Sequence, residues 1–187
     1  MTKGSDSIFF LSFQKRLDNP DAVTEYIYIL GGSGGGVWLK IFVSACLLGM
    51  NCRYCGGGCL DDKILSLASK HSLVPVCPEQ LGGLPTPREP DEIRGGRVVS
   101  KSGADNTEYF RRGASEVLRL AKMFGCDVAV LKERSPSCGS SMIYDGTFTG
   151  HRIPGAGVTA SLLMENGVRV FSEENIDELL AEEGDAN

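Results

Sequence analysis

The run Ile41-Phe42-Val43-Ser44-Ala45-Cys46-Leu47-Leu48 is the first regular segment of this chain, and it predicts a buried strand over residues 41–48. The run is short and almost continuously apolar, which is typical of a strand that is covered on both faces. Three further apolar runs lie downstream, at residues 73–77, 127–131 and 168–171. We interpret each of them as another strand of the same sheet.

Helical spacing of apolar residues separates these runs. It predicts helices over residues 60–71, 108–124, 158–165 and 176–183, and Gly125 and Gly167 are natural stop signals. Alternating strands and helices form parallel sheets with right-handed crossovers. We therefore predict a single doubly wound α/β fold of four or five mostly parallel strands with helices on both faces, Rossmann-like or flavodoxin-like.

The segment 82–104, rich in Gly, Pro and Arg, is interpreted as an extended loop, and residues 150–157 as a turn before a helix.

The first 39 of the 187 residues differ from the rest. They hold few periodic apolar positions and end in the glycine-rich run 31–36, which is typical of a flexible linker. We expect residues 1–39 to be a flexible extension, or an upstream segment translated from a wrongly assigned start with Val37 as the true one. Residues 40–187 are expected to form the α/β domain.

Charge and cysteine content restrict the class of protein. The net charge of -5 disfavours a nucleic-acid-binding surface, although a few local arginines could still hold a small anion. The only early apolar run, residues 8–13, is too short for a signal core or a membrane span. Seven cysteines cannot all pair, so we expect a reducing cytoplasm in which cysteines serve metal binding or catalysis. With only two histidines, a metal site would consist mainly of thiolates and would favour zinc, copper(I) or iron–sulfur.

Three cysteines follow predicted strands. Cys46 lies in the first run, Cys77 ends the second, and Cys138 follows the third by a short loop. In a parallel sheet, the carboxyl ends of strands gather at the edge where ligands bind. Each cysteine alone is more simply a buried structural residue. Three such coincidences together favour a shared site.

Three thiolates fit two kinds of centre: a catalytic zinc with one open position, or a cubane cluster with one iron left without a protein ligand. Glu79 and Ser135 lie close to Cys77 and Cys138 in sequence and are candidates for handling protons. Arg88, in the proline-rich segment 84–88, could bind an anionic or carbonyl-bearing substrate, because its guanidinium donates bidentately. The alternative is a surface arginine in a rigid loop.

A second, local cysteine group has the spacing C-x-x-C-x-x-x-C and comprises Cys52, Cys55 and Cys59. It could form a small thiolate metal site or an entry loop that shields the main site. A structural zinc would need a fourth ligand, and no cysteine pair follows at the usual distance. The simplest interpretation is a glycine-rich loop with reduced thiols.

Several strings of this sequence resemble a known family. Residues 43–49 with Cys52-Arg53-Tyr54, residues 75–79 and 82–88, residues 131–139 and residues 143–148 together resemble the small bacterial family that includes thiouracil desulfidase. The resemblance covers about residues 40–174. The chain departs from it at Cys55, where the family usually has an aspartate, and at Cys59.

This resemblance implies a [4Fe–4S] cluster on Cys46, Cys77 and Cys138. It implies an enzyme that takes the sulfur from a thiolated pyrimidine base such as thiouracil and releases hydrosulfide and the oxygen analogue, with assistance from Glu79 and Ser135. The expected partner is thus a small thiolated base; the sequence leaves the oligomeric state open. Two other functions stay open: a zinc or iron–sulfur module without turnover, and a sulfur-handling enzyme that acts on modified nucleosides in RNA. The acidic charge balance counts against the latter.

Overall fold

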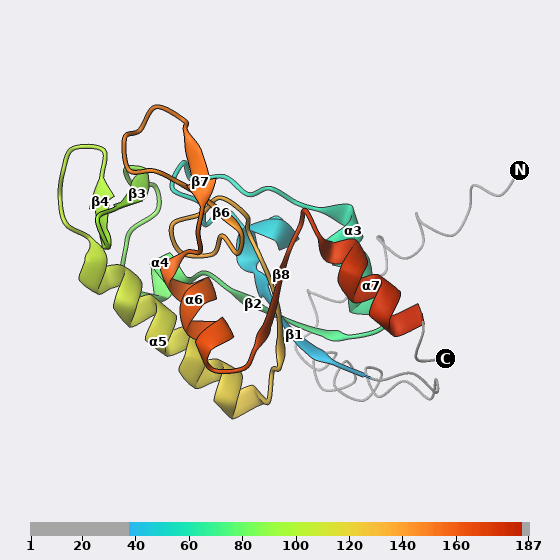
Figure 1. Cartoon of the computed structure of the whole chain (residues 1–187). Helices are drawn as coiled ribbons and strands as arrows, with labels where there is room; N and C mark the ends of the chain where they lie inside the picture. Colours follow the sequence, from blue (N-terminus) through green and yellow to red (C-terminus); the bar gives the residue numbers. More distant parts are fainter. Residues whose placement is uncertain (1–37, 185–187) are drawn as a thin grey trace, which may run out of the picture. The chain divides into compact units, whose positions relative to one another are not determined.

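A four-stranded parallel sheet forms the centre of the domain (Figure 1). The structure is a computed structural model that describes residues 38–184, so most of the predicted extension over residues 1–39 lies outside the described residues. The strand order is β2-β1-β5-β8, and every neighbouring pair is parallel. The strands are β1 (Lys40–Ser44), β2 (Ser72–Val76), β5 (Val128–Leu131) and β8 (Arg169–Ser172). The predicted doubly wound α/β fold is confirmed, with four strands in its sheet.

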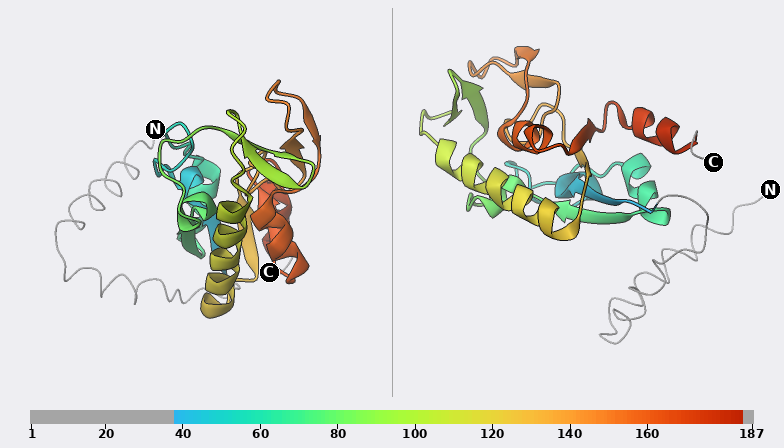
Figure 2. Two further views of the ribbon diagram at one scale, coloured as in Figure 1. Left: turned by 90° about the vertical axis from the view of Figure 1, so that its left-hand side faces the viewer. Right: turned by 60° about the horizontal axis from the view of Figure 1, so that its bottom comes forward.

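Helices cover both faces of this sheet (Figure 2). Successive strand residues point to opposite faces, so Ile41 and Val43 pack on one side while Phe42 packs on the other. The first face is covered by α3 (Asp62–Ser66) and α7 (Ile176–Gly184), and the second by α5 (Thr107–Phe124) and α6 (Val158–Glu165). Burying a side chain such as that of Phe42, which is 0% exposed, contributes about 1.5–3 kcal/mol.

Two predicted elements are shorter than the sequence indicated. The strand expected over residues 41–48 ends at Ser44, and the 3-10 helix η1 (Ala45–Leu48) follows it. The chain turns there because the N–H groups of Gly49 and Met50 bond back to carbonyls of η1, both at 3.1 Å. Cys46 therefore lies in a turn beyond the strand. The helix expected over residues 60–71 divides into α3 and the 3-10 helix η2 (Leu67–Ser69).

The predicted loop over residues 82–104 is wrong in its second half. There, β3 (Asp91–Arg94) and β4 (Arg97–Ser100) form an antiparallel hairpin. Its two-residue turn is Gly95-Gly96, with φ of 57° and 76°, which favours glycine at both positions. This glycine pair indicates a hairpin turn, but the high Gly, Pro and Arg content of the whole segment favoured the interpretation as a loop.

A second hairpin forms where only a turn was predicted, over residues 150–157. It pairs β6 (Met142–Tyr144) with β7 (Arg152–Pro154). The two hairpins join where the Phe148 N–H donates to the Glu92 carboxylate at 2.9 Å. Both rise above the carboxyl ends of the central strands (Figure 1). They supply walls that the sheet alone lacks.

The short helix α4 (Pro78–Leu81) follows β2 directly and packs very closely on α5. A side chain at Gly113, in the middle of α5, would collide with the Pro78 carbonyl oxygen. Arg112 of α5 also donates from Nε to the Gly82 carbonyl at 2.7 Å. These contacts fix the start of α4, and with it Cys77 and Glu79.

Candidate functional site

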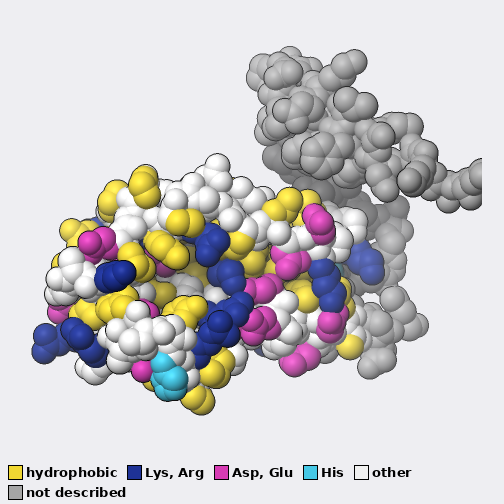
Figure 3. Space-filling view, turned by 90° about the horizontal axis from the view of Figure 1, so that it is seen from above, with side chains coloured by type: hydrophobic (Ala, Val, Ile, Leu, Met, Phe, Trp, Pro, Cys, Tyr) yellow, Lys and Arg dark blue, Asp and Glu magenta, His cyan; other side chains and the backbone are white. Residues whose placement is uncertain are grey.

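A cavity of about 450 Å³ opens at the carboxyl ends of β1, β2 and β5. Its walls come from the loops after these strands and from both hairpins. Figure 3 looks onto this edge and shows a hollow with Lys and Arg side chains around it. The cationic residues that line the cavity are Arg53, Arg88, Lys101, Lys132 and Arg134. This is the edge where a sheet of this topology binds ligands.

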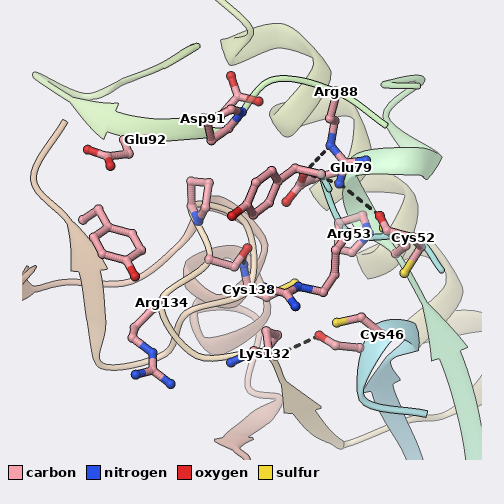
Figure 4. A pocket seen from close by; sticks show the side chains of 18 of the residues that line it. Cys46, Cys52, Arg53, Glu79, Arg88, Asp91, Glu92, Lys132, Arg134 and Cys138 are labelled. Atoms are coloured by element: carbon pink, nitrogen blue, oxygen red, sulfur yellow. Dashed lines mark hydrogen bonds and ion pairs between the residues drawn. The ribbon is translucent and has the colours of Figure 1, made fainter. Parts of the chain in front are cut away.

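The three cysteines predicted from the strand ends all line this cavity. Cys46 lies in η1, Cys77 directly precedes α4, and Cys138 lies in the loop after β5. Cys46 and Cys138 are 7% and 6% exposed, and Cys77 is half-buried. In Figure 4, the sulfur atoms of Cys46 and Cys138 face the same space. Residues 92 positions apart in the chain thus present thiols to one cavity because parallel strands end at one edge.

The environment of these thiols favours their protonated form. Burial, above all, raises the pKa of Cys138 to about 12. The pKa of Cys77 is also raised, first by a hydrogen bond with the Cys52 thiol and then by burial. A thiophilic metal that binds here therefore displaces protons, so its apparent affinity falls as the pH falls.

Glu79 lies on α4, two residues after Cys77, and is held by Arg88. Nε of Arg88 donates to Oε2 of Glu79 at 2.7 Å, and the two side chains are only 6% and 15% exposed. Figure 4 shows this carboxylate at the upper wall of the cavity. The Arg88 guanidinium also donates to Pro85 O, Thr86 Oγ1 and Cys52 O, at 3.0, 3.1 and 3.1 Å. These contacts favour a positioning role for Arg88; substrate binding by Arg88 stays a prediction.

Ser135 lies in the loop that carries Cys138. Its Oγ accepts the N–H groups of Ser137 and Cys138, both at 3.1 Å. The hydroxyl oxygen therefore caps the turn that presents the Cys138 thiol, while the hydroxyl group keeps its own hydrogen as a donor. Ser135 also lines the cavity, so one side chain can brace the loop and face a substrate.

Glu133 anchors the other end of this loop, and sequence reasoning gave it no role. Its carboxylate is 1% exposed and accepts hydrogen bonds from Ser140 N, Ser140 Oγ, Ser141 N and Met142 N, at 2.8–3.2 Å. Burial alone would raise the pKa of this carboxyl group, but the hydrogen bonds outweigh it and lower the pKa to about 2. A charged carboxylate thus organises the backbone beyond Cys138.

The cations at the cavity differ in their pairing. Lys132 forms an ion pair with Glu173, and Arg134 pairs with Glu174 at 2.8 Å, both in the segment after β8. Arg53 extends toward Cys138 in Figure 4. Among residues 38–181, no carboxylate forms an ion pair with Arg53, whose guanidinium lies 5.9 Å from the centre of the Tyr54 ring. Arg53 is thus a cation able to meet a negative charge inside the cavity, as is Lys101, which also lines the cavity and forms no ion pair with a described carboxylate.

The local cysteine group over residues 52–59 separates in space. Cys52 is buried and lines the cavity, Cys55 is exposed, and Cys59 packs against the hydrophobic core. Within the described part of the chain, no group of three or more Cys, His, Asp or Glu residues is arranged around a single metal ion. Of the three cysteines in this loop, Cys52 alone contributes a thiol to the lining of the main cavity.

The thiols at the cavity suit an iron–sulfur cluster. A cubane cluster presents separate irons, so each thiolate can bind a different corner. Cys46, Cys77 and Cys138 stand on three separate elements around one buried space. The donor set is entirely thiolate, and thiolate is the usual protein ligand of iron–sulfur centres.

Sequence reasoning missed some of the residues at this site. Cys52 was assigned to the local group, although it lines the main cavity. Asp91 and Glu92 were placed in a loop, although both are only 8% exposed and line the cavity from β3. The Gly95-Gly96 pair could have predicted the β3–β4 hairpin from the sequence, but not that this hairpin forms a wall of the cavity.

Comparisons with known proteins identify the family and relatives of this chain. The model of the 2-thiouracil desulfurase family matches residues 41–175. The protein YbbK of Bacillus subtilis (strain 168), itself uncharacterised, is 46% identical over 150 residues, which cover 75% of this chain and 99% of YbbK. The solved structure of the [4Fe–4S]-dependent thiouracil desulfidase TudS is similar with a TM-score of 0.72 and 45% identity, covering 76% of this chain and 96% of TudS.

Proposed function

The chain belongs to the 2-thiouracil desulfurase family, and from this premise we propose that it removes the exocyclic sulfur of a thiolated pyrimidine base such as 2-thiouracil. The reaction consumes water and yields the oxygen analogue of the base and hydrosulfide, with no net oxidation or reduction. The main support for this proposal is that three thiols from separate elements line one cavity together with Glu79 and Ser135. The likeness to TudS, at 45% identity, supports the same chemistry.

Cys46, Cys77 and Cys138 would hold a [4Fe–4S] cluster in this chain. When bound by three thiolates, such a cluster supplies one iron without a protein ligand, which can act as a Lewis acid toward sulfur. The loops that carry the three cysteines are braced independently, by Gly49 after η1, by the packing of α4 on α5, and by Glu133 beyond Cys138. Such bracing supports a preformed ligand set.

Glu79 is the candidate general base. Its carboxylate is held by Arg88 in one orientation at the cavity wall. From there it can accept a proton from the water that attacks the carbon bearing sulfur. A positioned base of this kind typically contributes 10²–10⁴-fold to a rate.

Ser135 is the candidate donor. Its oxygen is occupied by two backbone N–H groups, which leaves its own hydrogen to donate toward the substrate or the departing sulfur. Arg53 offers a positive charge to sulfur as the sulfur acquires negative charge.

A small free base fits this site better than a thiolated RNA does. The net charge of -5 opposes a nucleic-acid partner, which requires an extended positive surface. None of the helices in residues 38–184 is long and apolar enough to span a membrane. We propose a cytoplasmic enzyme that acts on a freely diffusing base, because a reducing compartment keeps the seven cysteines available.

Anaerobic purification followed by iron and sulfide analysis and a 2-thiouracil turnover assay tests this function. We expect a brown protein with about four irons per chain that converts 2-thiouracil to uracil and releases sulfide in equal amounts. A colourless protein with stoichiometric zinc and no turnover would contradict the proposal. A loaded cluster without sulfide release from 2-thiouracil would restrict the proposal to the cluster and overturn the substrate.

A further inference from the structure

The two hairpins bring aromatic side chains to the cavity. Figure 4 shows Glu92 of the first hairpin across the cavity from Cys46. The aromatic residues that line the cavity are Tyr54, Tyr144 and Phe148. The last two belong to the second hairpin, Tyr144 at the end of β6 and Phe148 in the loop between β6 and β7. A cavity that holds thiols on one side thus has flat apolar surfaces in its hairpin wall.

From this arrangement we infer that the Phe148 ring packs on the face of the substrate ring and makes the site selective for planar, unsaturated bases. The inference rests on the proposed function, because it takes a thiolated pyrimidine base as the substrate. It assigns Phe148 as a specificity-determining residue and Glu92 as the positioning residue that holds it. Both are distinct from Glu79 and Ser135, the residues proposed for the chemistry.

Phe148 presents a less occupied ring than the other two aromatic residues. The Arg53 guanidinium lies 5.9 Å from the centre of the Tyr54 ring, and that of Arg152 lies 6.0 Å from the centre of the Tyr144 ring. In the part of the chain whose side chains the structure describes, no Lys or Arg lies over the Phe148 ring. A planar base can therefore pack on this ring without displacing a cation.

The backbone of Phe148 has a conformation that phenylalanine rarely adopts. Its φ is 59°, in the left-handed region that favours glycine. The Phe148 N–H donates to Oε2 of Glu92 at 2.9 Å, and Glu92 is only 8% exposed. Residues strained in this way persist only where their surroundings hold them, and they cluster at ligand-binding sites. A buried carboxylate thus fixes the backbone from which the Phe148 ring projects.

The rest of this loop is constrained as well. Oδ1 of Asp145 accepts from the Thr147 N–H at 2.9 Å and from the Thr147 hydroxyl at 2.6 Å. At Gly146 the loop lies so close to β3 that a Cβ there would stand 2.5 Å from the Cβ of Arg94. The loop that carries Phe148 is therefore seated on the first hairpin. Such preorganisation lowers the entropic cost of binding, because the ring is already in place when the base arrives.

Stacking on an aromatic ring depends on the shape of the base. It typically strengthens binding by a factor of about 5–150 for each stacked base. It tolerates changes in the hydrogen-bonding edge, because every unsaturated base has a π face. Dihydro-2-thiouracil keeps the polar edge of 2-thiouracil, but its ring carbon–carbon bond is saturated and its ring is puckered. The Phe148 ring should therefore favour 2-thiouracil over its dihydro form.

Steady-state kinetics of the reconstituted holoenzyme with these two substrates test the inference. We expect wild type to have a KM for 2-thiouracil at least about fivefold below that for the dihydro form. Phe148→Leu should raise the KM for 2-thiouracil by about 5–150-fold with kcat nearly unchanged, and should abolish the preference. Phe148→Tyr keeps a ring and should retain the preference.

Phe124→Leu is the matched control for this substitution. Phe124 is exposed at the end of α5, and its carbonyl accepts from Nζ of Lys40 at the start of β1, so it lies at the opposite edge of the sheet. Phe124→Leu should change neither KM nor the preference for 2-thiouracil.

Calorimetric titration of the holoenzyme with uracil, the expected product, measures the same contact without turnover. Glu92→Leu removes the acceptor of the Phe148 N–H and should weaken uracil binding, as Phe148→Leu does. The double variant should bind uracil no more weakly than Phe148→Leu alone, because both changes remove one contact. Glu92→Gln keeps an acceptor oxygen and should return uracil binding toward wild type.

An unchanged preference for 2-thiouracil in a folded, iron-loaded Phe148→Leu variant would overturn the inference and leave the proposed function intact. Equal KM values for the two substrates in wild type would do the same. Should Phe148→Leu fail to fold, the two Glu92 variants decide, and wild-type uracil binding in Glu92→Leu would count against the inference. A wild-type holoenzyme that neither converts 2-thiouracil nor binds uracil would overturn the inference and the proposed function together.

Discussion

Nε of Arg88 donates a 2.7 Å hydrogen bond to Oε2 of Glu79, and the same guanidinium holds the backbone carbonyl of Cys52. One buried cation thus joins the start of α4, the proline-rich loop before β3 and the loop after η1. Since these segments carry the candidate base and two of the cavity's thiols, the pair connects the acid–base residues to the proposed cluster site.

Glu79→Gln should separate cluster binding from chemistry. Glutamine keeps the size of glutamate and an oxygen that accepts from Arg88, but it cannot take a proton at neutral pH. We expect full iron content, a cluster spectrum that still changes when 2-thiouracil binds, and turnover reduced by roughly 10²–10⁴-fold. Turnover near that of wild type in a fully loaded variant would remove Glu79 from the mechanism and leave Ser135 as the remaining candidate.

Arg88→Lys distinguishes a positioning role from substrate binding. Lysine keeps the charge but cannot reproduce the guanidinium fork that reaches Glu79, Pro85 O and Cys52 O together. If Arg88 positions Glu79, kcat should fall at least tenfold while KM for 2-thiouracil changes little, and the unfolding free energy should fall by about 1–3 kcal/mol. A large rise in KM with kcat preserved would instead show that Arg88 binds the substrate.

The three proposed ligands should be individually essential. Cys46→Ser, Cys77→Ser and Cys138→Ser should each lose the cluster and all activity, because hard hydroxyl oxygen is a poor substitute for thiolate on iron. Cys126→Ser is the matched control: it is also buried, but it precedes β5 at the opposite edge of the sheet and should retain its iron. Iron and sulfide analysis checks this, and a triple variant that still bound near four irons would refute the ligand set.

Ser135→Asn separates the two roles of Ser135. The asparagine carbonyl oxygen can accept the same two backbone N–H groups that Ser135 Oγ accepts at 3.1 Å, so the Cys138 loop should persist with its iron. The hydroxyl donor is lost, and turnover should fall by roughly 10²–10⁴-fold. Ser135→Ala should lose both functions and also bind less iron. If Ser135→Asn turned over as fast as wild type, Ser135 would only hold the Cys138 loop in place and would take no part in the chemistry.

Acid should destabilise the domain through Glu133. The folded state lowers the pKa of this carboxyl group to about 2, so its stabilisation is present above the ordinary pKa near 4.5 and is lost as the pH falls toward 2. The shift corresponds to about 3 kcal/mol. Urea unfolding should show that Glu133→Gln lowers the unfolding free energy at pH 7, and that the gap from wild type narrows below pH 4. A gap of constant size across this range would mean that Glu133 does not titrate as described.

The sequence by itself determined the parallel sheet and the edge at which its chemistry lies. Apolar runs such as residues 41–48 and helical spacing such as that of residues 108–124 are local patterns in the sequence. They predict secondary structure well because the apolar side of each strand or helix must pack against a neighbouring element. Cys46, Cys77 and Cys138 could be brought to one edge on that basis alone, since parallel strands end together. The end of β1 at Ser44 was missed because the 3-10 turn after it is as apolar as the strand.

Only the tertiary structure decided which side chains complete the cavity. Glu92 of β3 reaches the Phe148 N–H across 56 residues, and Arg88 reaches the Cys52 carbonyl across 36. A guanidinium or a carboxylate can satisfy its hydrogen bonds with any exposed backbone group, so local sequence does not select the partner. Burial selects it, because polar groups enclosed together must pair with one another once water is excluded. That is why Cys52 belongs to the main cavity, although its sequence spacing groups it with Cys55 and Cys59.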